Sequence, residues 1–375
     1  MTSIAEKLMS IEQLDPNATI LVYGRMVADI SVENVPIFYT NPMDESSNNG
    51  EPVAMAADTA NSKILFLCDN DNSHEFYELE FSDYTQGAVQ NATNLNGQPT
   101  DGIIDVANGI AFYTSNNSNY FIDISDGSNV TELHNFDPSS AGGGDGFQVA
   151  ADLSERVFFY SIQDGINDSK IEGVAAAADY TSLSYHNNIA TLTASSSKMY
   201  ESVGLCVDTT NKYVFYADND NLTYYIRDYT SFASAGTTSS VGSITFTTGT
   251  DGNDRRIFSA IADPTSDVVY AIDARNDDLL AIDYSSPASP ALLSVLHING
   301  GYENRCPIIA DFANDRIYLS AGGSGSTTAQ DPVNIINVSN PSSMSIAQTL
   351  DNNFGLRGAE PFKTMLLLDF SAMGS

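Results

Sequence analysis

Residues 260–285 read Ala-Ile-Ala-Asp-Pro-Thr-Ser-Asp-Val-Val-Tyr-Ala-Ile-Asp-Ala-Arg-Asn-Asp-Asp-Leu-Leu-Ala-Ile-Asp-Tyr-Ser, and this stretch decides the fold because its pattern returns along the whole chain. It predicts a strand that ends at Asp263 and two further strands over residues 268–272 and 279–284. Pro, Ser, Asp and Asn fill the two turns between them. Three strands of about five residues cannot bury both faces alone. The copies of this unit must therefore pack on one another.

The first marker of the repeat is an acidic residue that closes the opening strand of each copy. It follows small or apolar residues, as in Ala-Met-Ala-Ala-Asp58, and occurs seven times at separations between 47 and 58 residues. We expect these carboxylates to have a structural role, accepting hydrogen bonds from the turn that follows them. The seven residues are Asp58, Asp105, Asp152, Asp208, Asp263, Asp311 and Asp369.

A second marker closes the third strand of each copy: an acid or Asn, then an apolar residue, then Ser or Thr. It also occurs seven times. A period near 50 residues with several strands per copy is typical of a β-propeller, in which each blade is a small antiparallel sheet. The sequence therefore predicts one all-β, seven-bladed propeller of four-stranded blades over residues 17–375. The second markers begin at Asp29, Glu80, Asp123, Asp179, Asp228, Asp283 and Asn337.

The two ends of the repeat region complement each other. The first copy offers only strands over 19–23, 26–31 and 36–39, and the last copy, 364–370, is only an opening strand. Three strands from the N-terminus and one from the C-terminus together complete one blade. Closing a ring in this way removes the exposed sheet edges that invite aggregation.

Residues 1–16 differ from the rest of the chain. Apolar residues recur there at helical spacing, and Ser3-Ile4-Ala5-Glu6 fits a capping box. We expect a short amphipathic helix that either packs on the propeller as a lid or docks the protein on a larger assembly. The residues of the apolar face are Ile4, Leu8, Ile11 and Leu14.

Charge and composition exclude several classes of partner. The formal net charge is −33, which argues against binding to nucleic acid or to an anionic membrane surface. No segment approaches the roughly 18 apolar residues of a membrane-spanning helix, so we expect no membrane insertion.

The N-terminus lacks a cationic leader followed by an apolar run, so no classical secretion signal is expected. Cys68, Cys206 and Cys306 are widely spaced and predict buried thiols.

Several turns offer the oxygen ligands that calcium prefers. Asp-Asn-Asp-Asn occurs twice, and a third turn is similarly acidic, although neither hairpin has the Gly and Glu positions of an EF-hand. The alternative is that these residues serve turn geometry alone, since Asp and Asn side chains bond nearby backbone amides. The four histidines show no zinc-binding spacing, and no nucleophile motif is present. The candidate calcium ligands are Asp69, Asp71, Asp218, Asp220, Asp273 and Asp277.

The opening-strand Asp, the turn, the Val-x-Tyr strand and the Asp-rich hairpin together resemble the repeats of the bacterial tyrosine-valine-threonine-asparagine propellers and of the NHL and low-density-lipoprotein-receptor propellers. The resemblance covers roughly residues 18–371. It implies blade geometry, and members of these families range from ligand-binding scaffolds to enzymes. The opening Ser3 to Leu8 also resembles short N-termini common in phage structural proteins.

With no catalytic constellation in the sequence, the first hypothesis is a non-enzymatic structural or recognition module. A phage virion or other extracellular particle is the expected location, with protein partners and glycans as ligands. Tyr185, Tyr200 and Tyr302 are candidates for sugar stacking.

Two alternatives stay open. Propellers that resemble gluconolactonases hold calcium at the channel mouth and hydrolyse lactones, which needs acids converging from several blades. The other alternative is an intracellular interaction scaffold in the cytoplasm. The acids that precede opening strands and could converge are Glu51, Asp101, Asp145, Glu201 and Glu303.

Overall fold

The structure is a computed structural model in which every described strand belongs to an antiparallel sheet of four, and these sheets number seven. The described residues are 19–23, 26–29, 37–39, 51–61, 63–69, 75–80, 90–91, 99–115, 118–127, 129–137, 145–164, 168–193, 203–298, 307–320, 333–350 and 365–369. The predicted helix with Ile4, Leu8, Ile11 and Leu14 lies outside these residues.

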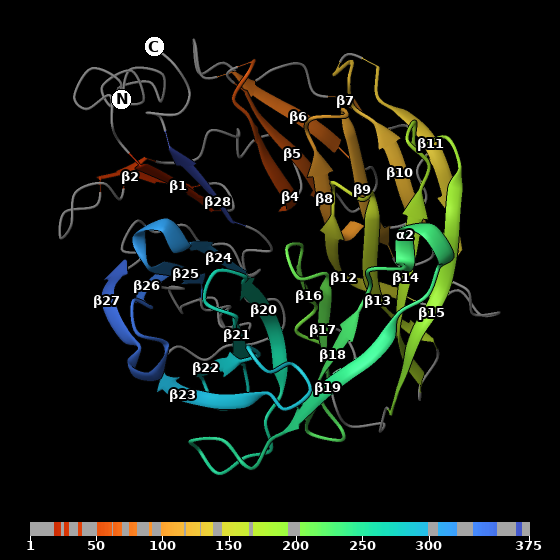
Figure 1. The fold of residues 1–375 in the computed structure, drawn as a ribbon. Helices are drawn as coiled ribbons and strands as arrows, with labels where there is room; N and C mark the ends of the chain where they lie inside the picture. Colours follow the sequence, from red (N-terminus) through yellow and green to blue (C-terminus); the bar gives the residue numbers. More distant parts are fainter. Residues whose placement is uncertain are drawn as a thin grey trace. The chain divides into compact units, whose positions relative to one another are not determined.

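The chain divides into two compact units. The first contains residues 1–113, 120–135 and 362–375, and the second contains 114–119 and 136–361. Three sheets belong mainly to the first unit (Figure 1). Their strands are β28 (Met365–Asp369), β1 (Thr19–Tyr23), β2 (Met26–Asp29) and β3 (Ile37–Tyr39); β4 (Glu51–Asp58), β5 (Lys63–Asp69), β6 (Glu75–Glu80) and β7 (Gln90–Asn91); and β8 (Pro99–Asp105), β9 (Ile110–Ser115), β10 (Asn119–Asp123) and β11 (Thr131–Phe136).

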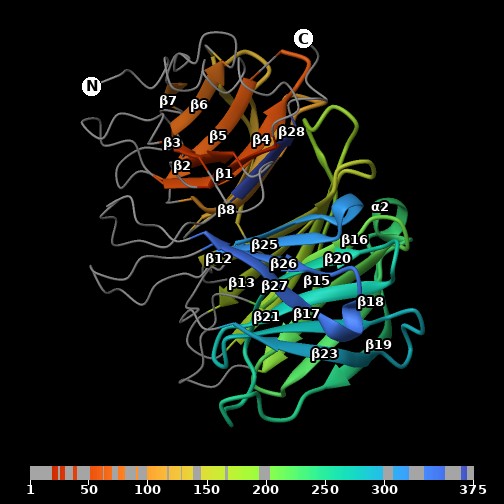
Figure 2. The same cartoon turned by 90° about the vertical axis from the view of Figure 1, so that its left-hand side faces the viewer.

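Four sheets belong to the second unit, and within each sheet the strands follow one another in sequence order, as Figure 1 shows for β16 to β19. Figure 2 shows the same strands, in green, from another side. The first two sheets are β12 (Asp145–Asp152), β13 (Val157–Asp164), β14 (Asp168–Ala176) and β15 (Leu183–Thr193), then β16 (Cys206–Asp208), β17 (Tyr213–Asp218), β18 (Thr223–Asp228) and β19 (Ser239–Thr245). The other two are β20 (Ile257–Asp263), β21 (Val268–Asp273), β22 (Asp278–Asp283) and β23 (Ala291–His297), then β24 (Ile308–Asp311), β25 (Arg316–Ser320), β26 (Val333–Asn337) and β27 (Ser345–Leu350).

Helical structure among the described residues is limited to three short turns. These are α2 (Phe232–Ala235), η1 (Phe312–Asn314) and η2 (Pro341–Ser343). None of the helices described reaches the length and apolarity that crossing a bilayer requires.

The stretch at 260–285 folds as its pattern predicts. β20, β21 and β22 pair in antiparallel register, with Asp263 opposite Val268 and Asp273 opposite Asp278 across the two turns. β23 adds a fourth strand to the same sheet. The all-β, four-stranded antiparallel architecture is confirmed.

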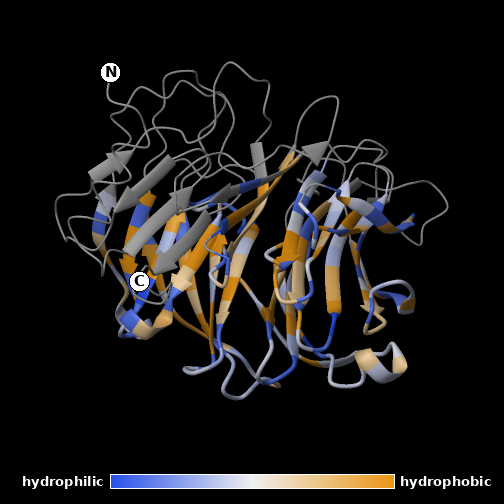
Figure 3. Ribbon diagram, turned by 90° about the horizontal axis from the view of Figure 1, so that it is seen from above, coloured by the Kyte–Doolittle hydropathy of each residue, from blue (hydrophilic) through white to orange (hydrophobic). Residues whose placement is uncertain are grey.

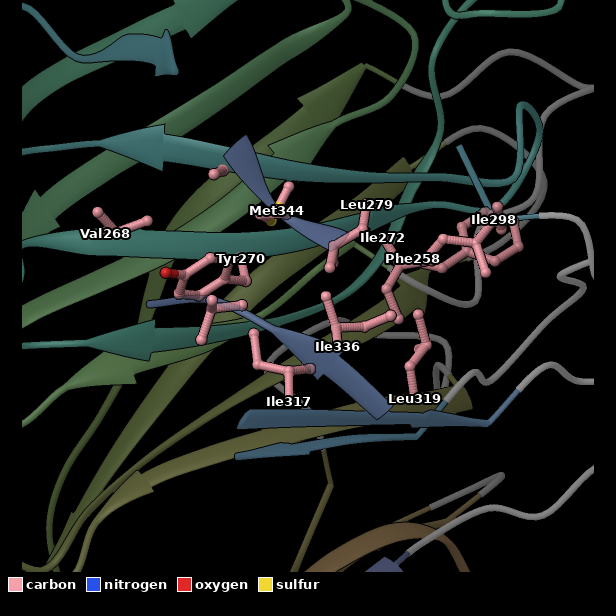
Figure 4. Close-up of a cluster of buried hydrophobic side chains, with 13 residues drawn as sticks. Phe258, Val268, Tyr270, Ile272, Leu279, Ile298, Ile317, Leu319, Ile336 and Met344 are labelled. Atoms are coloured by element: carbon pink, nitrogen blue, oxygen red, sulfur yellow. The ribbon is translucent and has the colours of Figure 1, made fainter. Parts of the chain in front are cut away.

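The two middle sheets of the second unit, β16–β19 and β20–β23, bury both faces against their neighbours. All six residues of β21 are buried, and because successive side chains in a strand point to opposite faces, they supply two cores. Tyr270 and Ile272 pack with Ile317, Leu319 and other residues of the β24–β27 sheet (Figure 4). Val269 and Ala271 pack on the β16–β19 sheet. Apolar strands between polar turns are visible in Figure 3.

The chain ends meet in one sheet. β28 pairs with β1 from Thr19 opposite Asp369 to Tyr23 opposite Met365, and the two strands lie together in Figure 1 in blue and red. The prediction that one C-terminal strand completes the three N-terminal strands is confirmed. Closure of the seven sheets into one ring stays a prediction.

The two markers of the repeat meet across neighbouring sheets of the second unit. The Tyr229 hydroxyl donates to an Asp152 Oδ2 oxygen at 3.0 Å, and the Tyr284 hydroxyl donates to Asp208 Oδ2 at 2.8 Å. Burial and the neighbouring carboxylate raise the pKa of both tyrosines, so the hydroxyls stay protonated donors. The opening-strand Asp of one sheet is therefore fastened to the third strand of the next.

Candidate functional site

A polar cluster of the second unit lies at one end of the β20–β23 sheet. It is built from the β21–β22 turn over residues 273–278, the segment 249–256 that leads into β20, and His297 at the end of β23. Asn276 joins the first two parts, because its Nδ2 donates to Asp273 Oδ2 at 2.7 Å and its Oδ1 accepts from the Asn253 amide at 3.3 Å. The cluster is therefore held by three separate segments of one sheet.

Asp273 is fully buried at the base of this cluster. Its Oδ1 accepts from the Arg256 amide at 2.8 Å and the Arg275 amide at 3.3 Å, and its Oδ2 lies 3.1 Å from Arg255 Nη1. Burial raises the pKa of this carboxyl, while the hydrogen bonds and the Arg255 charge act in the opposite direction. All its described partners are N–H donors, whereas calcium requires a shell of oxygen ligands.

Asp278 is the second buried carboxylate. Arg255 Nη1 also donates to its Oδ2, at 2.9 Å, so one guanidinium nitrogen bridges Asp273 and Asp278. Thr250 donates to the same oxygen through its amide at 3.1 Å and its hydroxyl at 2.8 Å. A buried ion pair tolerates desolvation only when its remaining hydrogen bonds are satisfied, and these contacts satisfy them on the Oδ2 side.

His297 covers Asp278 on the Oδ1 side. Its Nδ1 lies 3.2 Å from Asp278 Oδ1 and 3.1 Å from the Asn276 carbonyl oxygen. Because a carbonyl oxygen can only accept a hydrogen bond, Nδ1 carries the proton, and in the neutral ring Nε2 is the basic nitrogen. The hydrogen bond to Asp278 raises the pKa of His297. The imidazole side chain is 34% exposed, whereas the Asp278 side chain is fully buried.

This arrangement is suited to general-base catalysis. A buried carboxylate fixes the tautomer of a partly exposed imidazole, whose second nitrogen can then take a proton from a reacting group. Arg255 offsets the negative charge of the two carboxylates beneath it.

A second histidine–carboxylate contact lies in the β12–β15 sheet and has the opposite orientation. His186 Nε2 lies 3.0 Å from Glu172 Oε2 and 2.6 Å from the Tyr160 hydroxyl, which itself donates to Glu172 at 2.9 Å. Tyr160 and Glu172 are fully buried, and Phe136 packs edge-on against the imidazole. This network ties three strands together inside the sheet.

The candidate calcium ligands are distributed over separate turns. Asp218 accepts from the Asn221 amide at 3.2 Å and from Asn221 Nδ2 at 2.8 Å within its own turn. Asp277 takes a left-handed conformation, with φ of 51°, in the β21–β22 turn. Among the residues that the structure describes, no group of three or more acids, histidines or cysteines is arranged to hold a metal. Asp220 lies in the same turn as Asp218, the Asp69 side chain and Asp71 fall outside the described part, and calcium binding stays a prediction.

The opening-strand acids accept hydrogen bonds from the turns that follow them. Asp208 illustrates the geometry, with the Asn211 amide at 2.9 Å from Oδ1 and Asn211 Nδ2 at 2.8 Å from Oδ2. The turn after each acid supplies the donors to Asp58, Asp105, Asp152, Asp263 and Asp311 as well. The Asp369 side chain lies outside the description.

Of the acids that could converge at a channel mouth and the tyrosines that could stack on sugars, the structure describes the side chains of Asp101 and Tyr185. Gly102 donates its amide to Asp101 at 2.8 Å. Tyr185 donates its hydroxyl to the Ser234 carbonyl at 2.5 Å and, partly buried, packs against the core between the β12–β15 and β16–β19 sheets. Glu201, Glu303, Tyr200, Tyr302 and the side chains of Glu51 and Asp145 lie outside the described residues. Protein partners, glycan binding, absence of nucleic acid and location stay predictions.

Sequence reasoning missed Arg255 and His297. A search for close histidine spacings could not find His297, because its partner Asp278 lies 19 positions away in the chain. The available signal was strand register: Asp278 opens β22, and His297 lies directly opposite it at the end of β23. A prediction of where the fourth strand of this repeat begins and ends would have placed His297 opposite Asp278.

No protein-family model matches the sequence, and no curated protein is significantly similar to it. Several solved structures match over most of the chain. The periplasmic gluconolactonase of Pseudomonas aeruginosa is 7% identical, with a TM-score of 0.66 over 94% of this chain and 99% of its own. A candidate 6-phosphogluconolactonase from Bacteroides fragilis is 9% identical, with a TM-score of 0.65 over 95% and 99%. The β-propeller domain of Swd1 from Myceliophteria thermophila is 9% identical, with a TM-score of 0.54 over 81% and 94%.

These similarities show the β-propeller fold and correct the functional hypothesis. The expectation of a non-enzymatic structural or recognition module was wrong, because two of these three structures that share the fold carry lactonase names and none is a virion protein. The alternative of an interaction scaffold stays a prediction. The physical reason for the error is that no local motif marks the His297–Asp278 pair, which only the pairing of β22 with β23 assembles. The resemblance to phage N-termini has no support.

Proposed function

We propose that this protein is a hydrolase of lactones, with His297 as the general base. The observation that carries the proposal is the pairing of the partly exposed His297 with the buried Asp278. The lactonase names of two structures with the same fold supply the substrate class. Because one fold hosts many functions, the site carries the argument and the fold similarity only narrows it.

The first step is attack by water on the lactone carbonyl. His297 Nε2 takes a proton from the water while the water oxygen forms a bond to the carbonyl carbon, giving a tetrahedral intermediate. The proton on Nδ1 remains in its hydrogen bonds to Asp278 and the Asn276 carbonyl. Asp278 thereby stabilises the imidazolium that forms.

The second step opens the ring. The bond between the carbonyl carbon and the ring oxygen breaks, and the proton held on Nε2 passes to that leaving oxygen, so the product is a hydroxy acid and His297 returns to its neutral form. The positive charge of Arg255 offsets the negative charge of the Asp278 carboxylate throughout, since its Nη1 lies 2.9 Å from Oδ2. No step requires a group beyond water and the side chains named.

The test is a screen of γ- and δ-lactones, glucono-δ-lactone among them, with the full chain and a pH-indicator readout of acid release. His297→Asn retains a donor toward Asp278 but has no basic nitrogen, and we expect it to lower kcat by about 10²–10⁴-fold. His134→Asn on β11 is the matched control, and its activity should equal that of the wild type.

Two outcomes would overturn the proposal: no lactone turned over by the wild type, or His297→Asn as active as His134→Asn. Equal melting temperatures for the two variants exclude misfolding as the cause of a loss. Assays with added calcium and with a chelator belong to the same screen, because a calcium requirement would move the catalytic role away from His297.

A further inference from the structure

Arg256 and Arg275 lie next to each other at the same end of the β20–β23 sheet. Both backbone amides donate to one oxygen, Asp273 Oδ1, at 2.8 and 3.3 Å. The Ala274 amide also donates to the Arg256 carbonyl at 3.0 Å. The backbone therefore fixes the two arginines as neighbours across the start of β20 and the β21–β22 turn.

Within the described part of the chain, neither guanidinium group has a hydrogen-bond or ion-pair partner at close range, although the charges of Asp220, Asp254 and Asp273 act on Arg256. Among the described residues, none accepts a hydrogen bond from or forms an ion pair with the side chain of Arg256 or Arg275, and Arg256 Nε is shielded from solvent without an acceptor. Arg255 behaves differently, because it bridges Asp273 and Asp278. Asp273 and Asp278, the two buried carboxylates of the cluster, are thus already paired with Arg255.

Two guanidinium Nε atoms of the described residues are buried without an acceptor, those of Arg156 and Arg256, and only Arg256 has a second arginine beside it. Acidic residues number 48 and basic residues 15, so carboxylates are abundant in this chain. Arg256 is half-buried, and burial together with the charge of Arg275 lowers its pKa, although Asp220, Asp254 and Asp273 act in the opposite direction. Two like charges held together at a cost in solvation are explained if an anion binds between them.

We propose that Arg256 and Arg275 form a binding site for a small oxyanion, a carboxylate or a phosphate group. The planar guanidinium group donates paired hydrogen bonds that match the oxygen spacing of both anions. Arg275 is exposed and can reach an incoming ligand, while the shielded Nε–H of Arg256 gains the acceptor it lacks.

The anion site adjoins the histidine. Arg275 precedes Asn276, whose carbonyl oxygen contacts His297 Nδ1 at 3.1 Å. A lactone with an acidic substituent can therefore place its anion on the arginines and its ring near the imidazole. This assignment of substrate class rests on the proposed function, whereas the anion site itself does not.

Calorimetry of the full chain with inorganic phosphate and, separately, with gluconate tests the site without turnover and distinguishes the two anions. Loss of one charged hydrogen bond corresponds to about tenfold or more in affinity, so we expect Arg275→Gln and Arg256→Gln each to weaken binding of the preferred anion by that factor. Arg316→Gln on β25 removes the same charge elsewhere and should change the affinity less than about twofold.

Failure of both anions to bind the wild type, or equal losses in Arg275→Gln and Arg316→Gln, would overturn the anion site. The second arm compares KM for a neutral lactone and for one with a phosphate or carboxylate group, and Arg275→Gln should raise only the latter. A protein that binds anions but hydrolyses no lactone keeps this site and loses the proposed function. If the protein hydrolyses lactones but Arg275→Gln leaves KM for the acidic lactone unchanged, the proposed function stands and the anion site has no role in substrate binding.

Discussion

At the scale of single residues, His297 is distinguished by which nitrogen faces the protein. Nδ1 contacts Asp278 and a carbonyl oxygen, whereas His186 turns Nε2 toward the buried Glu172. The two histidines thus differ in which ring nitrogen faces the carboxylate, and this decides which nitrogen is available for catalysis.

The raised pKa of His297 predicts the pH dependence of catalysis. A protonated imidazole cannot accept a proton, so kcat/KM falls as the pH decreases through the pKa of His297, which lies above its ordinary value of 6.5. In Asp278→Asn, which removes the main cause of the shift, this limb should move to lower pH. The measurement is kcat/KM against pH, corrected for spontaneous lactone opening in buffer; an unmoved limb in the variant would assign it to another group.

The same shift affects stability with the opposite sign. The folded protein holds the His297 proton more tightly than the unfolded chain does, so this contribution to stability is complete below the unfolded pKa near 6.5 and is lost as the pH rises through the folded pKa. Catalysis by His297 is therefore favoured at pH values above its pKa, whereas the stabilisation by its proton is favoured below it.

At the scale of elements, the site depends on how the segment before β20 approaches the β21–β22 turn. The Gly249 amide donates to the Asn253 carbonyl at 2.7 Å and closes a tight loop, and Asn253 then contacts the fully buried Asn276. This loop presents Thr250 to Asp278. The site thus forms where the loop before β20 meets the β21–β22 turn, and no short sequence motif encodes it.

Gly249→Ala should damage the loop and the site at once. A Cβ at this position would lie 2.2 Å from Asn276 Cγ, and the fully buried Asn276 has no room to move. Overpacking of this kind costs about 1–3 kcal/mol, so we expect a lower free energy of unfolding in urea and reduced lactone hydrolysis. Thr248→Ala, at an exposed neighbouring position, is the control, and equal behaviour of the two variants would contradict the role of the close approach.

At the scale of the whole molecule, the repeat is held together by contacts between sheets. In the second unit, alternate side chains of β21 enter two different cores, and Tyr229 and Tyr284 fasten the third strand of one sheet to the opening strand of the sheet before it. A sheet in such an array gains most of its stability from its neighbours. Loss of one strand should accordingly be felt beyond its own sheet.

Removal of residues 361–375 tests this coupling. The truncation deletes β28 and exposes the edge of β1, which pairs with it over five residues. We expect the melting temperature to fall by about 5 °C or more, with faster proteolysis. A shorter deletion of residues 370–375 retains β28 and should melt like the full chain. Unchanged melting of the longer truncation would show that β28 is dispensable.

The sequence by itself determined the repeat and its strands, because a strand's alternation of apolar residues and a turn's need for Asp, Asn and Pro are local properties. It also paired the two chain ends, since the incomplete first and last copies add up to one sheet. It could not reveal Arg255, Arg256, Arg275, Asp278 and His297 as one site. Their proximity follows from strand register and from a turn closing over a buried carboxylate, and those distances exist only in the folded sheet.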